Sequence, residues 1–217
     1  MNDIRRTLTA VSAFFMLSTV FCQVLAAGEP VFETPDLRNL QEGAHALKKG
    51  STIDAMSNFE DSARFGNKAA QKMLGMMYVK GVGTELDWPL GYAWLKLAAT
   101  HGDPEAVSAR DQVMAQLKPE EVPLANDRFE EINEEFGDLA AIKRREAWVR
   151  KEKRKITGSR TGKSSAVRIE VADATGYTWQ VAGAKYFQLL EGSYVLEFRQ
   201  RMGEVTYGEL EVIDEDP

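Results

Sequence analysis

The sequence predicts a mainly α-helical protein, in which a short solenoid of helical hairpins is closed by a charged helix and followed by a small antiparallel β domain. Three observations lead to this prediction. One segment repeats itself at an offset of 36 residues, an apolar stripe runs along an acidic helix after the repeats, and apolar residues alternate near the C-terminus. The chain has 217 residues and 44% hydrophobic residues, which is enough for a core in one or two domains.

Residues 1–27 are predicted to be a secretory signal peptide and not part of the fold. Arg5 and Arg6 form a positively charged start, an apolar stretch follows, and small residues stand at its end. This order is typical of a signal peptide, and the apolar stretch is shorter than the ~20 residues that span a bilayer. Cleavage is expected after Ala26 or after Ala27, and Ala26 fits better.

The signal predicts export, and the periplasm is the expected location. Two destinations rank behind it, an outer-membrane lipoprotein and a secreted protein. Cys22 is the one cysteine and would carry the lipid, but Phe21 precedes it where lipoprotein signals need a small residue. If Cys22 is removed with the signal, no disulfide can form and the core alone must hold the fold.

Residues 36–117 contain the internal repeat. The run Gly66-Asn67-Lys68-Ala69-Ala70 returns 36 residues later as Gly102-Asp103-Pro104-Glu105-Ala106. A period of this length fits two helices and two turns. One such hairpin cannot bury its apolar face alone, so a stack of hairpins is expected.

The best-preserved unit runs from residue 67 to residue 102. Apolar residues at helical spacing predict a first helix over 68–78 and a second over 88–101. The loop Gly81-Val82-Gly83 separates them, because glycine adopts backbone angles that other residues avoid. The unit therefore reads as one helical hairpin with a glycine-containing connection.

This unit resembles the Sel1-like repeat family. The residues that carry the resemblance follow one another in the family's order: Leu74, Gly75, Tyr78, Gly81, Gly83, Asp87, Ala93, Trp94, Ala98, Ala99 and Gly102. The resemblance implies a right-handed α-solenoid in a bacterial, exported protein. It also implies a non-enzymatic adaptor of the cell envelope that binds a protein or peptide in the groove of the stack.

Both neighbours of this unit are predicted to be helical. Residues 37–66 look like a tetratricopeptide hairpin with the short loop 49–51, and residues 104–117 look like a further first helix. Residues 118–155 are predicted to form a long charged region that caps the stack. Its apolar stripe consists of Val122, Ala125, Phe129, Ile132, Phe136 and Leu139.

Charge is strongly segregated within that capping region. Residues 120–138 are acidic and residues 143–155 are basic, while the whole chain has a net charge of −6. The net charge argues against nucleic-acid binding, which needs a basic face. The basic run leaves open a weak contact with an anionic membrane surface, and thus a membrane-surface scaffold as an alternative function. The acidic run is interpreted as a solvated helix face.

The sequence contains no motif of a catalytic, cofactor or metal site, so no catalytic residue, cofactor or metal is expected and the chain is predicted not to be an enzyme. An envelope enzyme that uses carboxylates of the groove remains the alternative, because active sites assemble in space. Trp94 is expected in the core. Trp88, Tyr92 and His101 are the predicted contacts for a protein partner, whose identity the sequence leaves open.

The last part of the chain is predicted to be a linker followed by β structure. Residues 156–165 are rich in Gly, Ser and Thr, and residues 166–217 alternate in the manner of strands. Five short strands are expected, over 167–171, 177–181, 187–190, 194–198 and 205–213. They predict a small antiparallel β domain.

Overall fold

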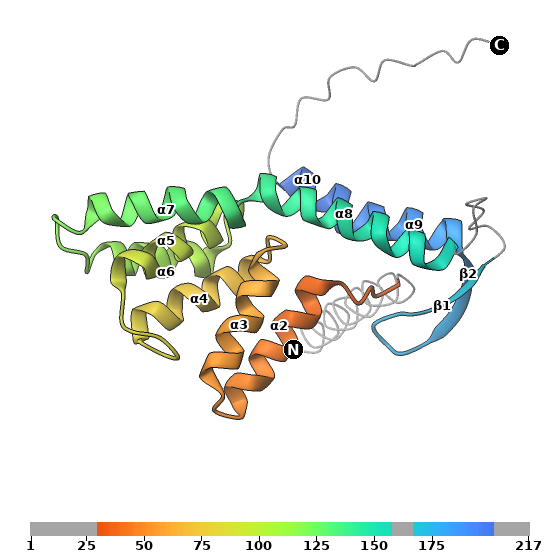
Figure 1. Ribbon diagram of the computed structural model, residues 1–217, viewed down its shortest axis with the longest axis horizontal. Helices are drawn as coiled ribbons and strands as arrows, with labels where there is room; N and C mark the ends of the chain where they lie inside the picture. The colour runs from red at the N-terminus through yellow and green to blue at the C-terminus, as the bar shows by residue number, and fades with distance from the viewer. Residues whose placement is uncertain (1–29, 158–166, 202–217) are drawn as a thin grey trace, which may run out of the picture. The chain divides into compact units, whose positions relative to one another are not determined.

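The structure is a computed structural model that describes residues 30–157 and 167–201. It is mostly helical with a small antiparallel sheet, as the sequence predicts (Figure 1). The predicted signal peptide lies outside the described residues. The described chain divides into two compact units, and the larger of them, residues 33–153 with 190–201, contains the repeats. The smaller unit consists of residues 30–32, 154–157 and 167–189.

Two helical hairpins begin the larger unit, in agreement with the repeat. Helix α2 (Pro35–Lys48) packs against α3 (Thr52–Ala63), and α4 (Lys68–Lys80) packs against α5 (Trp88–Ala98). A single turn of 3-10 helix (Ala99–His101) extends α5 to the predicted end of the second helix. The 36-residue period is therefore the length of one hairpin with its connections.

The connection of the second hairpin depends on two glycines. Gly81 ends α4 with a φ of +64°, and Gly83 follows with a φ of +76°. Both angles lie in the left-handed region, where a side chain is strained. A Cβ atom at Gly83 would also lie 2.9 Å from the carbonyl oxygen of Thr52, so this loop touches the start of α3.

The predicted capping helix is two helices. Helix α6 (Pro104–Met114) follows the second hairpin as predicted, and α7 (Val122–Phe136) packs on α5. Extended backbone at Gly137 then separates α7 from α8 (Asp138–Thr157). A Cβ at Gly137 would lie 2.2 Å from the carbonyl oxygen of Asn133, so only glycine fits this break.

The apolar stripe is confirmed on α7 and wrong beyond it. Ala125 and Phe136 are buried, and Phe129 and Ile132 pack against the core. Leu139 is 73% exposed because it follows the break at Gly137 and no longer shares the face of α7. The main core cluster of this unit consists of Ala55, Phe59, Ala63, Ala70, Leu74, Met77, Trp94, Leu97 and Phe136.

The smaller unit contains the two-stranded sheet. Strand β1 (Arg168–Ala172) pairs antiparallel with β2 (Thr178–Ala182), which confirms the first two predicted strands. Asp173 holds the turn between them, since its Oδ1 accepts hydrogen bonds from the backbone N of Thr175 at 2.8 Å and of Tyr177 at 3.1 Å. The backbone N of Val31 donates to the carbonyl oxygen of Ala172 at 2.8 Å.

The strands predicted over 187–190 and 194–198 are wrong, because residues 183–201 are helical. They form α9 (Gly183–Glu191), a π-helical turn (Gly192–Leu196) and α10 (Glu197–Arg201). The buried residues of this stretch recur at helical spacing. The buried apolar and aromatic side chains are those of Phe187, Leu190, Tyr194, Val195 and Phe198. Gly192 suggested a turn between two strands, although the backbone passes through it as helix. The fifth predicted strand, 205–213, lies outside the described residues.

Candidate functional site

A pocket of about 720 Å³ lies along helices α4 and α6, and we call it the α4–α6 groove. Met76 and Val79 of α4 and Trp88 at the start of α5 form one side of its lining. One face of α6 and the turn after it supply the rest: Pro104, Glu105, Ser108, Ala109, Gln112, Val113, Ala115 and Gln116.

Helical periodicity explains why these residues share a surface. Residues three and four positions apart lie on one face of a helix, and the lining residues of α6 follow that spacing. Met76 and Val79 are also three apart, whereas Leu74 and Met77 of the same helix are buried in the core. Since α5 packs against both α4 and α6, it holds the two walls in place.

Trp88 is the predicted partner contact that lines the groove. Its neighbour Asp87 caps α5 by accepting a hydrogen bond from the backbone N of Leu90 at 2.9 Å, which fixes the position of the first turn. The Trp88 side chain is half-buried and faces the groove. Tyr92 is also half-buried but does not line the groove, and His101 lies elsewhere.

The residues of the repeat motif serve packing. Six of them are buried, namely Leu74, Gly75, Ala93, Trp94, Ala98 and Ala99. Trp94 meets Phe136 edge to face, with 4.7 Å between ring centroids. Tyr78 is half-buried, and Gly81, Gly83 and Gly102 have positive φ angles at the ends of helices and in the loop. The motif therefore describes the scaffold of the groove and not its surface.

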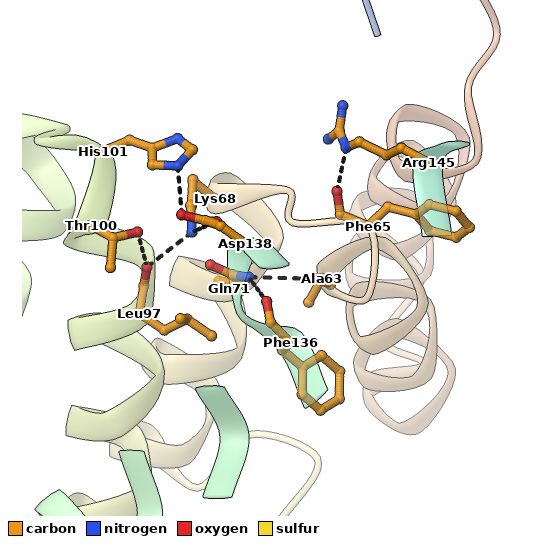
Figure 2. A network of polar contacts seen from close by, with 10 residues as sticks. All are labelled: Ala63, Phe65, Lys68, Gln71, Leu97, Thr100, His101, Phe136, Asp138 and Arg145. Atoms are coloured by element: carbon orange, nitrogen blue, oxygen red, sulfur yellow. Dashed lines mark hydrogen bonds and ion pairs between the residues drawn. The ribbon is translucent and has the colours of Figure 1, made fainter. Parts of the chain in front are cut away.

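A polar network fixes the end of α4 that is farther from the groove (Figure 2). Lys68 Nζ lies 2.8 Å from Asp138 Oδ1 and donates to the carbonyl oxygen of Leu97 at 3.3 Å. His101 Nε2 lies 3.0 Å from Asp138 Oδ2, and the Thr100 hydroxyl donates to the same Leu97 carbonyl. Asp138 thus joins the starts of α8 and α4 to the end of α5.

The charges of this network shift two pKa values. Burial lowers the pKa of Lys68, and the nearby carboxylate of Asp138 opposes that shift. Burial alone would raise the pKa of Asp138, but the hydrogen bond with His101 and the charge of Lys68 outweigh it, so the pKa lies below its ordinary value. His101 therefore has a partner within the protein, and its role as a contact for another protein stays a prediction.

Gln71 completes the polar framework inside the hairpins. It is fully buried, and its Nε2 donates to the carbonyl oxygens of Phe136 at 3.0 Å and Ala63 at 3.4 Å (Figure 2). Both carbonyls stand at helix ends, where backbone oxygens have no partner within the helix. One side chain of α4 thereby holds the ends of α3 and α7.

The role of Arg145 cannot be predicted from the sequence, in which this residue belongs to the basic run 143–155. Its side chain is buried and donates to the carbonyl oxygens of Phe65 at 2.7 Å and Tyr194 at 2.9 Å, and to Asp36 Oδ2 at 3.2 Å. Its guanidinium also stacks 4.1 Å from the ring centroid of Phe198. Because its partners are distant in sequence, no local pattern identifies them.

Other cations of the basic run are also engaged within the protein. Arg144 donates to the carbonyl oxygens of Arg64 and Glu135, and Lys153 pairs with Glu191. Arg150 is exposed and lies 3.7 Å from Glu146. The membrane-surface alternative therefore has fewer available charges than the sequence suggests.

A second, smaller pocket of about 430 Å³ lies at the other end of α4, and we call it the basic pocket. Three cations, Lys68, Lys72 and Arg201, line it together with His101. The remaining lining residues are Ala69, Gly102, Asp103 and Ala106. Lys72 also pairs with the exposed Glu105 at 2.6 Å.

The envelope-enzyme alternative would require a carboxyl group with a raised pKa in a pocket. Burial raises the pKa of Glu60, but Glu60 lines neither the α4–α6 groove nor the basic pocket. Within residues 30–157 and 167–201, no group of three or more His, Cys, Asp or Glu side chains is arranged to hold a metal ion.

Comparison with known proteins gives one likeness of fold. No protein-family model and no curated protein matches the chain. The chain is similar to the crystal structure of c5321, described as a protective antigen present in uropathogenic Escherichia coli strains displaying an SLR fold, at 23% identity and a TM-score of 0.44. The match covers 50% of this chain and 24% of that one, so this chain spans about a quarter of its length.

None of the described helices combines the length and the apolar character that crossing a membrane requires.

Proposed function

We propose that this protein is a helical-repeat adaptor that binds a segment of another protein in the α4–α6 groove. The proposal rests on the lining of the groove, which consists of apolar side chains from two helices and the half-buried Trp88. Tryptophan is enriched among the residues that contribute most to protein interfaces. Because six motif residues are buried in the core, the side chains available for recognition are those of Met76, Val79, Trp88 and the groove face of α6.

The size of the groove favours a short segment over a broad surface. Pockets of roughly 300–1,000 Å³ enclose one ligand of moderate size, whereas a standard protein interface buries about 800 Å² of each partner. Apolar side chains stand beside Ser108, Gln112 and Gln116, whose polar groups can bond a backbone. A peptide or one amphipathic helix with apolar anchors matches this lining.

We place this activity in the bacterial cell envelope. Support comes from the N-terminal pattern, with Arg5 and Arg6 before an apolar stretch and small residues at its end. The Sel1-like motif order supports a protein-binding role in the same compartment. Fractionation of cells that produce the full chain should recover it, shortened by about 26 residues, in the periplasmic fraction.

Site-specific photo-crosslinking in living cells tests the groove. A photoreactive residue at Gln112, which lines the groove, should give a discrete adduct with another protein. The matched control is Asp111, the adjacent exposed residue of α6 that does not line it. Equal adducts at the two positions, or none at Gln112, would refute the groove as the binding site.

A further inference from the structure

The α4–α6 groove and the basic pocket follow one another along the same two helices. Lys68 and Lys72 of α4 line the basic pocket, and Met76 and Val79, one and two turns further on, line the groove. At the start of α6, the basic-pocket residues Asp103 and Ala106 directly flank Pro104 and Glu105, which line the groove. A ligand that enters at the basic pocket can therefore continue into the groove.

The chain itself reaches the entrance of this path. Arg201, the last residue of α10, lines the basic pocket together with Gly102 and Lys72. The sequence continues for sixteen residues beyond it, from Met202 to Pro217. From Lys68 to Val79 the path is about 16 Å long at 1.5 Å per helical residue. Sixteen extended residues span up to about 50 Å, so the segment is long enough.

The composition of residues 202–217 complements both pockets. The segment holds six acidic side chains and no basic one, and its apolar residues include Val205, Tyr207 and Leu210. Arg201 is 69% exposed, and its ion pair among the described residues is a distant one with Glu197, at 4.0 Å. The exposed pair of Lys72 with Glu105 contributes little, because surface ion pairs are weak, so Lys72 can exchange its partner. Lys68 stays with Asp138, its largely buried neighbour.

We propose that residues 202–217 bind in the α4–α6 groove of their own chain, with acidic side chains at the basic pocket and apolar ones against Met76, Val79 and Trp88. This inference rests on the proposed function, because it assigns to residues 202–217 the groove in which an external partner is proposed to bind. A tethered segment acts at an effective concentration in the millimolar range, so even a weak contact fills the groove. An external partner must then displace the segment, which makes the segment an autoinhibitory ligand.

Disulfide trapping in the full chain tests this proposal. All variants carry Cys22→Ser. One pairs Gln112→Cys with Thr206→Cys, and the control pairs Asp111→Cys with the same Thr206→Cys. Gln112 lies nine residues beyond Asp103, about 14 Å along α6, which five extended residues from Arg201 can cover. An intrachain disulfide should form at least tenfold faster for the pair at 112, and in concentrated urea the two pairs should react at the same rate.

Equal rates for the two pairs without denaturant would overturn the proposal. Disulfides between chains only would also overturn it, because they assign the groove to the segment of a second copy. Amide replacement of the six acidic side chains should slow trapping several-fold, and an unchanged rate would contradict the role of the basic pocket. If no disulfide forms but the photo-adduct at Gln112 persists, residues 202–217 do not occupy the groove, and the proposed function stands. If the disulfide forms but no photo-adduct is found, residues 202–217 occupy the groove, and the proposed binding of another protein is refuted.

Discussion

The two faces of helix α4 have different roles, because one packs in the core and the other lines the two pockets. One face contains Leu74, Gly75 and Met77, which pack in the core against α5 and are almost completely buried. The other face carries Lys72, Met76 and Val79 along two pockets. The repeat motif belongs to the first face. A repeat motif in this chain therefore reports how the hairpin packs, while recognition depends on residues that the motif leaves unspecified.

The largest expected difference between the two faces lies in their contribution to stability. Leu74→Ala should lower the free energy of unfolding by about 2–5 kcal/mol, because it removes a fully buried side chain and leaves a cavity. Met76→Ala, two residues away and half-buried, should cost about 1 kcal/mol or less. Chemical denaturation measures both. Equal losses would mean that the groove face is also core.

The close approach of α4 and α5 should give the next largest effect. A Cβ at Gly75 would lie 2.7 Å from Leu95 Cγ and 3.0 Å from the carbonyl oxygen of Gly91, which is backbone and cannot move aside. Gly75→Val should therefore cost about 1–3 kcal/mol through overpacking. Ala69→Val introduces the same side chain at an exposed position of α4 and serves as the control. A neutral Gly75→Val would contradict the close packing.

A smaller effect is expected from pH. The pKa of Asp138 is depressed in the folded chain, so its ionised form stabilises the fold above its ordinary pKa of 3.8, and this contribution is lost as the pH falls through the lower folded-state value. Thermal unfolding measured at pH values below about 5 should show less loss of stability on acidification for Asp138→Asn than for the wild type. Parallel curves for the two proteins would contradict the ion pair with Lys68.

The sequence predicts the hairpins well because their signals are local. Glycines with left-handed backbone angles and alanines at close helix contacts recur at a fixed offset, and each can be recognised from a short stretch of sequence. The strand prediction fails in residues 183–201, which are helical. Short apolar groups on either side of Gly192 fit both strands and a helix, and only the length of the whole segment distinguishes the two.

Long-range polar contacts cannot be predicted from the sequence. Arg145 lies within a run of cations, yet its partners are Asp36, Phe65 and Tyr194, far away along the chain in both directions. The sequence singled out one of the residues that line the groove. Trp88 was a predicted contact and lines it, but the facing residues of α6 carry no motif, and only the packing of α5 against both α4 and α6 brings them opposite Trp88.

We propose that the groove face of the repeat unit binds a protein segment, whereas the packing face stabilises the fold. The most direct test is a Trp88→Ala variant that carries the photoreactive residue at Gln112, compared in cells with the same chain retaining Trp88. If the groove binds the partner, the adduct should fall at least fivefold while circular dichroism shows unchanged helical content. An adduct of undiminished yield in the folded variant would contradict it.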